Sequence, residues 1–302
     1  MALAAPITPH LWFDREAREA AEFYCATFPD SRIAYVSEIR DAPSGTCEVV
    51  SFSVWGQDFL AIGAGPLFRP NPSVSFFVNF DPSRDPRARE NLDALWERLS
   101  PGGTVLMALD AYPWSPRYGW IQDRFGLSWQ LILANPDGAP RPPIVPSLLF
   151  VGPVYGRAEE AMRFYMSVFP ESQEGVVARY PAGMAPHEEG TLMYGDFRLG
   201  GGWFAAMDGA GEHPFRFSEG ISFMVRCRDQ AEIDYYWERL SAVPEAEQCG
   251  WCKDRFGLSW QVVPTALDAV MRSGDADRIA RITQAFLPMK KFDVAALEAA
   301  AA

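Results

Sequence analysis

The chain has 302 residues, of which 48% are hydrophobic, 14% aromatic and 22% charged, which is the composition of a folded protein with room for two domains. The 39 Asp and Glu residues exceed the 27 Lys and Arg residues, and the resulting formal charge of -12 disfavours nucleic acids and anionic membranes as partners. No apolar run reaches the roughly 18 residues of a membrane helix. Residues 1–9 lack the features of a secretion signal, and the five cysteines are irregularly spaced. We therefore expect a cytoplasmic protein.

The hydrophobic pattern predicts the same series of elements twice. A strand at 7–13 leads into a helix whose apolar residues 17, 20, 21 and 24 follow helical spacing. Strands follow at 49–54, 59–63 and 73–80, then a helix that contains Trp96 and a strand that ends in Gln130. After a linker rich in Pro and Gly at 135–146, the series returns with a strand at 147–151 and a helix whose apolar residues 158, 161, 162 and 165 follow helical spacing. Strands follow at 191–199, 203–207 and 221–227, then a helix that contains Trp237 and a strand that ends in Gln261.

The repetition extends to the residues themselves. Twelve residues at 119–130 recur at 250–261 with changes at only two positions, and shorter blocks at 23–31 and 96–100 recur at 164–172 and 237–241. The repeated blocks lie 141 residues apart before residue 100 and 131 apart after it, so the first module carries ten extra residues. These fall around 110–117, where the prolines predict a loop. The sequence therefore predicts an internal duplication.

Several of these blocks resemble a known family. The Phe-Tyr and Phe-Pro-Asp/Glu-Ser blocks, the strand start Ile221-Ser222-Phe223, the block at 250–264 and the tail at 284–293 are similar to PhnB-like proteins. These form the demethylubiquinone methyltransferase-like branch of the glyoxalase, or vicinal-oxygen-chelate, superfamily. The resemblance implies an α+β fold of two tandem glyoxalase-like modules, each built of βαβββ units with cupped mixed sheets. We expect module 1 at 1–134, a linker at 135–146, module 2 at 147–264 and a helical tail at 265–302.

The resemblance also implies where a metal would bind. Relatives with a metal draw ligands from the first and last strands of a module, and the matching residues here are His10, Gln130, Gln261 and Ser147. Strand alternation places His10 and Trp12 on one face. This set contains no carboxylate, and divalent ions prefer His with Cys or carboxylate ligands. We therefore expect no cofactor, and a divalent metal on His10, Gln130 and Gln261 remains the weaker alternative.

Other motifs are better explained by structure. Asp123 and Asp254, in the repeated Asp-Arg-Phe-Gly segment, are predicted to be turn residues before the last strand. The Cys249-Gly-Trp-Cys252 spacing lacks a second pair and leads into a strand, so we expect packing residues. The glycines at 63–65 and 200–202 lack the context of a nucleotide-binding loop, which disfavours a methyltransferase.

The residues support two readings of function. The chain is predicted to be a small-molecule binding protein, or a lyase or isomerase of the glyoxalase kind, whose cavity lies between cupped sheets. Trp12, Gln130, Gln261 and Ser147 are the candidate ligand-binding residues, and His10 is the candidate catalytic residue because it alone could titrate near neutral pH. The alternatives are sequestration without turnover and a partner-binding regulatory module. The expected partner is a small molecule, and the expected assembly is a monomer or homodimer.

Overall fold

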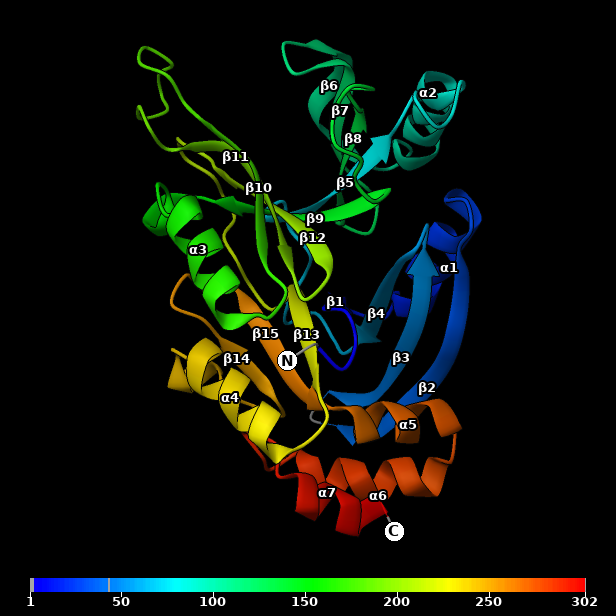
Figure 1. The fold of residues 1–302 in the computed structure, drawn as a ribbon. Helices are drawn as coiled ribbons and strands as arrows, with labels where there is room; N and C mark the ends of the chain where they lie inside the picture. Colours follow the sequence, from blue (N-terminus) through cyan, green and yellow to red (C-terminus); the bar gives the residue numbers. More distant parts are fainter. Residues whose placement is uncertain (1–2, 43, 302) are drawn as a thin grey trace.

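The computed structural model describes residues 3–42 and 44–301, which form two mixed β-sheets with helices packed on them (Figure 1). The seven-stranded sheet has the order β14 (Trp251–Lys253), β15 (Ser259–Pro264), β13 (Ile221–Cys227), β1 (Thr8–Phe13), β4 (Gln57–Gly63), β3 (Gly45–Val54) and β2 (Arg32–Ala42). The eight-stranded sheet has the order β10 (Gln173–Arg179), β11 (Leu192–Leu199), β12 (Gly202–Asp208), β9 (Ile144–Phe150), β5 (Val74–Phe80), β8 (Ser128–Leu133), β7 (Ser115–Gln122) and β6 (Thr104–Tyr112). The helices are α1 (Ala17–Thr27), α2 (Ala88–Leu99), α3 (Ala158–Val168), α4 (Gln230–Leu240), α5 (Thr265–Ser273), α6 (Ala276–Phe286) and α7 (Val294–Ala301).

Each sheet combines one half of each sequence repeat. β1 pairs with β13 of the second repeat in antiparallel register, with His10 opposite Ser222. In the other sheet β9 pairs with β5 of the first repeat, with Ser147 opposite Ser75. The α+β fold of repeated βαβββ units is therefore as predicted. The sheets, however, divide the chain differently from the sequence repeats.

The helix and strand patterns read from the sequence reappear in the structure. All of the apolar positions that predicted α1 and α3 are buried, because each helix turns that stripe toward a sheet. The predicted loop at 110–117 is wrong, since these residues belong to the β6–β7 hairpin, whose turn contains Pro113. Proline is compatible with the turn itself, so the ten extra residues lengthen two paired strands. The edge strands β2 and β10 had no predicted counterpart because their burial pattern is irregular.

The repeated Asp-Arg-Phe-Gly segment forms a buried anchor in both repeats. The Asp123 carboxylate accepts hydrogen bonds from the backbone N–H groups of Phe125 and Leu127, from Trp129 Nε1 at 2.8 Å and from the Tyr24 hydroxyl at 2.9 Å. Asp254 accepts the equivalent four bonds in the second repeat. The anchor ties the turn before the last strand to the helix of the same repeat, which explains why the segment is preserved in both copies.

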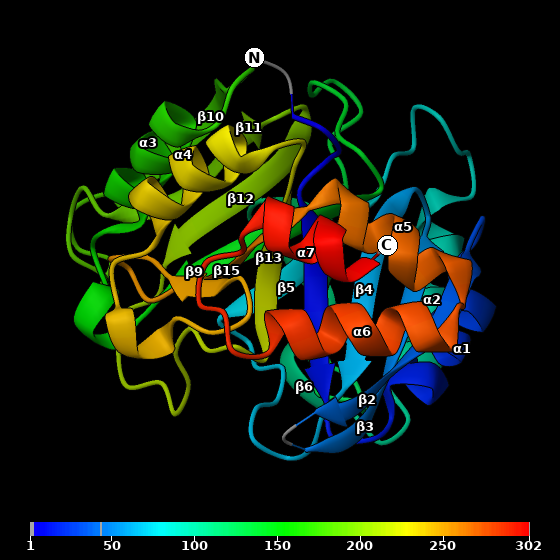
Figure 2. The same cartoon turned by 90° about the horizontal axis from the view of Figure 1, so that it is seen from below.

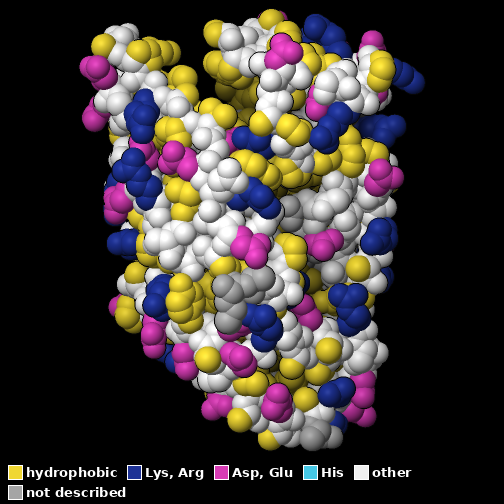
Figure 3. All heavy atoms as spheres, in the orientation of Figure 1, with side chains coloured by type: hydrophobic (Ala, Val, Ile, Leu, Met, Phe, Trp, Pro, Cys, Tyr) yellow, Lys and Arg dark blue, Asp and Glu magenta, His cyan; other side chains and the backbone are white. Residues whose placement is uncertain are grey.

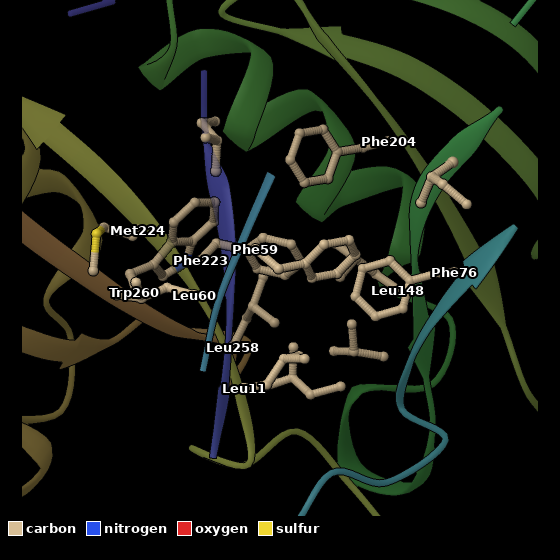
Figure 4. Close-up of a cluster of buried hydrophobic side chains, with 14 of the residues drawn as sticks. Leu11, Phe59, Leu60, Phe76, Leu148, Phe204, Phe223, Met224, Leu258 and Trp260 are labelled. Carbon is tan, nitrogen blue, oxygen red and sulfur yellow. The ribbon is translucent and has the colours of Figure 1, made fainter. Parts of the chain in front are cut away.

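The main core lies between the two sheets, which pack back to back. Phe59 of β4 meets Phe76 of β5 with ring centroids 5.1 Å apart, and Phe204 of β12 meets Phe223 of β13 at 5.4 Å. Figure 4 shows side chains from both sheets converging in this layer. The opposite face of each sheet therefore points away from the core. In Figure 2, α5, α6 and α7 lie across the outer face of the seven-stranded sheet.

Candidate functional site

The structure divides the predicted site residues between two separate faces. His10, Trp12 and Gln261 lie on the seven-stranded sheet, whereas Gln130 and Ser147 lie on the eight-stranded sheet. The expectation of one cavity lined by His10, Trp12, Gln130 and Gln261 is therefore wrong. The reason is the strand pairing: the first strand of each repeat lies in the same sheet as the last strand of the other repeat.

On the seven-stranded sheet, His10 is fully enclosed. Its ring packs edge-on against Trp251 with centroids 5.3 Å apart, and its Nδ1 atom has no hydrogen-bond partner among the described residues. The amide nitrogen of the neighbouring Gln261 donates to the Ser222 hydroxyl at 2.9 Å. Burial, together with the positive charge of Arg226, lowers the pKa of His10 to about 3. The imidazole is therefore neutral at physiological pH.

The tail of the chain covers this face. Arg226 of β13 forms an ion pair with Asp268 of α5 and donates a hydrogen bond to the Thr8 hydroxyl at 2.6 Å. The three tail helices bury apolar side chains toward the sheet and one another: Val270, Met271, Ile279, Ile282, Phe286 and Leu297. The polar residues around His10 thus lie beneath the chain's own helices.

Trp12 is also engaged within the protein. Its Nε1 atom donates to the Gly65 carbonyl at 2.8 Å, and its ring makes edge contacts with Phe68 and Trp251. The indole N–H therefore has a hydrogen-bond partner within the protein, and the ring packs against two aromatic side chains. The catalytic role of His10 and the ligand contact of Trp12 stay predictions.

The outer face of the eight-stranded sheet is rich in aromatic side chains. We call this set the aromatic face. It is a cluster distinct from the main core, formed by the buried Phe77, Tyr118, Val145 and Ala205 and the half-buried Met107, Tyr112, Trp120, Ile132, Tyr194, Trp203 and Met207. Aromatic walls with few polar groups are typical of small-molecule sites.

Two arms of the sheet border the aromatic face. One arm is the β10–β11 pair and the other is the β6–β7 hairpin, where the exposed Trp114 stacks on Tyr112 with centroids 5.1 Å apart. A pocket of about 450 Å³ borders the second arm, beside Tyr112, Trp114 and Leu133. Figure 3 shows the surface hollowed at the top between the arms, with hydrophobic side chains in the hollow. In contrast to the His10 face, this face is open to solvent between its arms.

A short chain of polar groups runs beneath the aromatic side chains. The Tyr118 hydroxyl donates to Gln130 Oε1 at 2.6 Å, and Gln130 Nε2 donates to the Ser75 hydroxyl at 2.8 Å. Ser147 lies directly opposite Ser75 on the adjacent strand, is completely buried, and has no hydrogen-bond partner among the described residues. Of the predicted residues, Gln130 and Ser147 are therefore brought together in this face.

The linker contributes one charged residue to the same face. Arg141 stacks on the Trp203 ring at 3.8 Å from its centroid and pairs with the Asp196 carboxylate through two hydrogen bonds of 2.7 and 3.1 Å. Asp196 also accepts the backbone N–H of Val176 at 2.7 Å. The Asp196 carboxylate is thus neutralised by Arg141, which is itself held by stacking on Trp203.

Sequence reasoning missed Ser75, Tyr118 and Tyr194. The repeat contained a signal for one of them: position 118 corresponds to position 249 of the second repeat, where the residue is Cys249 rather than Tyr. The Cys249 thiol points to the tail, where it donates to the Leu287 carbonyl. The residue directly before the repeated block therefore differs between the copies, and in the first copy it belongs to the aromatic face.

Neither face fits a metal ion. The predicted set of His10, Gln130 and Gln261 is divided between two sheets, and the described residues contain no group of three His, Cys, Asp or Glu side chains arranged to hold one. Near Ser147 the polar groups are uncharged, and both ends of the Gln130 amide are occupied. Divalent ions are bound by charged or imidazole ligands, which this arrangement does not supply.

The glycine-rich segments also do not fit an adenosyl cofactor. Gly200 and Gly201, both with positive φ, form the turn of the β11–β12 hairpin, and Gly63 ends β4. Neither segment stands between a strand and the N-terminus of a helix, which is the turn that doubly wound cofactor domains use. In the described part of the chain no helix has the length and apolar character needed to span a membrane.

Comparison with known structures supports the fold. Glyoxalase I from Zea mays aligns over 89% of this chain and 95% of its own, with a TM-score of 0.52 and 11% identity. A PhnB protein from Bacillus cereus is 31% identical over 43% of this chain and 100% of its own, with a TM-score of 0.38. Protein PA1353 from Pseudomonas aeruginosa is 22% identical over 43% of this chain and 98% of its own, with a TM-score of 0.36. Among curated proteins, none matches the sequence.

The family assignment rests on both repeats. The model of the family described as 3-demethylubiquinone-9 3-methyltransferase matches residues 5–132 and again residues 142–263. The two matches cover most of the chain and correspond to the two copies of the duplication. The glyoxalase-like architecture of Zea mays glyoxalase I agrees with them. The chain therefore belongs to the 3-demethylubiquinone-9 3-methyltransferase family and has the glyoxalase-like fold in two tandem copies.

Proposed function

We propose that the chain binds an uncharged, aromatic small molecule on the aromatic face of the eight-stranded sheet. The observation that carries this proposal is the aromatic face itself, a cluster of aromatic and Met side chains on the side of the sheet that faces away from the main core. Seven of its members are only partly buried, and four of these carry rings that are available for contact: Tyr112, Trp120, Tyr194 and Trp203. Stacking and edge contacts between rings add about 0.5–1.5 kcal/mol to the burial of area.

The charges around this face support a neutral ligand. Arg141 and Asp196 neutralise each other, and the remaining polar groups near Gln130 are hydroxyls and amides. An ionised ligand group beside Gln130 would have to leave water with only hydroxyl and amide neighbours, which is unfavourable. The guanidinium of Arg198 lies further along the face, 6.0 Å from the centre of the Trp203 ring and next to the β11–β12 turn.

Binding without turnover is the reading that the side chains favour. Burial raises the pKa of both Tyr118 and Tyr194, so both phenols stay protonated at neutral pH and act as hydrogen-bond donors rather than bases. General acid–base catalysis needs a group whose pKa lies near the working pH. His10, the group predicted for that role, lies on the other sheet and is covered by the tail. We therefore place sequestration ahead of a lyase or isomerase activity, and propose no metal or adenosyl cofactor.

A pair of equivalent substitutions tests the location of the site. Trp120 on the aromatic face corresponds to Trp251 beside His10 in the other repeat. We expect Trp120→Leu to weaken binding of indane, an uncharged aromatic hydrocarbon, by about 1 kcal/mol or more through loss of ring contact. Trp251→Leu should leave binding unchanged. The dissociation constants are measured by ligand-observed NMR, with thermal melting as a check on folding.

Two results would contradict the proposal. Indane that fails to bind the wild-type protein at millimolar concentration would remove the site. Equal weakening by both substitutions would place the ligand elsewhere or indicate a general effect on the fold.

A further inference from the structure

We infer that the Ser75 and Ser147 hydroxyls form a binding site for one carbonyl oxygen of the ligand, so that the ligand class is planar aromatic ketones or related uncharged carbonyl compounds. This inference rests on the function proposed above and specifies which aromatic molecules the face selects. It depends on the direction of the hydrogen bonds beneath the aromatic face.

The hydrogen-bond chain leaves the Ser75 proton free. Tyr118 donates to Gln130 Oε1, so the opposite end of that amide is the NH₂ group, which donates to Ser75 Oγ. Ser75 therefore acts as an acceptor in this chain. A hydroxyl also carries one donor, and no described residue accepts the Ser75 proton. The Ser75 O–H is thus an available donor at a position that is 1% exposed.

Ser147 supplies a second available donor. Its hydroxyl is fully buried and has no partner in the described part of the chain. Leu148 and Phe76, the next residues along the two strands, point into the main core, so Ser147 and Ser75 share the opposite face with Val145 and Phe77. A buried polar group without a partner costs roughly 1–3 kcal/mol, so a ligand atom that satisfies it gains affinity.

The spacing of the two strands fits a single acceptor atom. Side chains directly opposite each other in an antiparallel pair have Cβ atoms about 4.5–5.5 Å apart. Two hydroxyls at that separation can both reach one oxygen placed between them at ordinary hydrogen-bond length. A carbonyl oxygen has two lone pairs and no proton, so it accepts from both without leaving a donor unmet.

The other sheet provides an internal comparison. Gln261 donates to Ser222 in the same manner as Gln130 donates to Ser75, but the residue opposite Ser222 is His10. There the tail helices cover the face, whereas the aromatic rings border Ser147. Ser222 is therefore a matched control: it accepts a hydrogen bond from a glutamine amide and is buried, as Ser75 is, but it lies on the covered face.

The experiment compares two probes that differ at the carbonyl. 1-Indanone and indane share a planar bicyclic skeleton, and only indanone carries the oxygen. We expect the wild-type protein to bind indanone about tenfold more tightly than indane, and Ser147→Ala and Ser75→Ala each to weaken indanone binding about three- to tenfold, as expected for one neutral hydrogen bond. Both variants should bind indane as the wild type does, and Ser222→Ala should change neither affinity.

The outcomes separate this inference from the proposed function. Equal affinity of the wild type for both probes, or an equal loss of both affinities in Ser147→Ala, would overturn the carbonyl site while leaving the aromatic site in place. A Ser222→Ala variant as weak as Ser75→Ala would also overturn it, because the effect would then be general. Failure of both probes to bind would overturn the proposed function and this inference together.

Discussion

The burial of His10 makes a quantitative prediction about pH. The pKa of its imidazole is lowered to about 3, compared with about 6.5 in the unfolded chain. Between these two values the unfolded state binds a proton that the folded state does not, so the free energy of unfolding decreases as the pH falls below about 6.5. The stability associated with neutral His10 is fully present above that pH.

The size of the effect follows from the proton linkage. Each pH unit below the unfolded pKa costs about 1.4 kcal/mol, so the penalty at pH 5 is about 2 kcal/mol. His10→Ser removes the titration and introduces the residue found at the equivalent position, Ser147. Asp123, whose pKa burial raises to about 6, titrates in the opposite sense over the same range but is present in both proteins. The difference between wild type and variant therefore isolates His10.

The assay is urea unfolding of both proteins at pH 7 and pH 5. We expect the wild type to lose about 2 kcal/mol relative to His10→Ser between the two values, on top of a constant offset caused by the smaller side chain. A difference that stays the same at both pH values, within about 0.5 kcal/mol, would refute the reasoning. It would mean that the imidazole reaches solvent or a partner in the folded protein.

Two further predictions concern the scaffold. Asp123→Asn places an NH₂ group among four hydrogen-bond donors and leaves at least one of them unsatisfied. We therefore expect the free energy of unfolding in urea to fall by about 2–4 kcal/mol, and by a similar amount for the equivalent Asp254→Asn. Unchanged stability in either variant would show that the anchor is not needed. Asp268→Asn removes the charge that pairs with Arg226. We expect faster amide hydrogen exchange in α5 and a decrease of about 1–3 kcal/mol in the free energy of unfolding, while exchange in the β6–β7 hairpin, the control region, is unaffected. Protection in α5 equal to that of the wild type would contradict the role of this pair.

The sequence was sufficient for the repeated part of the molecule. The duplicated blocks predicted two copies of one fold, and the structural role expected for Asp123 and Asp254 agrees with their buried hydrogen bonds. Helical spacing located α1 and α3, because an amphipathic helix must turn one stripe to a sheet. These features depend on contacts within one repeat, and the spacing of residues along the sequence indicates such contacts.

The arrangement of the site depends on strand pairing between the two repeats, which the spacing of residues along the sequence does not indicate. Nothing in the spacing of His10 and Gln130 shows that β1 pairs with β13 rather than with a strand of its own repeat. The prolines near residue 113 suggested a loop, but the hairpin around them is held by the pairing of β7 with β8. Because β8 lies more than ten residues further along the chain, the local sequence does not indicate this pairing. The helices of the tail cover His10. The sequence predicted these helices but did not predict that they pack on the seven-stranded sheet.

The central claim, that the ligand occupies the open face of the eight-stranded sheet, is tested most directly by fluorine NMR of protein labelled with 5-fluorotryptophan. The resonances are assigned by single Trp→Phe substitutions and followed while 1-indanone is added. We predict that the signals of Trp120 and Trp203 shift with the ligand concentration while those of Trp12 and Trp251, on the covered face, remain in place. Shifts confined to Trp12 and Trp251 would contradict the account and place the ligand beside His10.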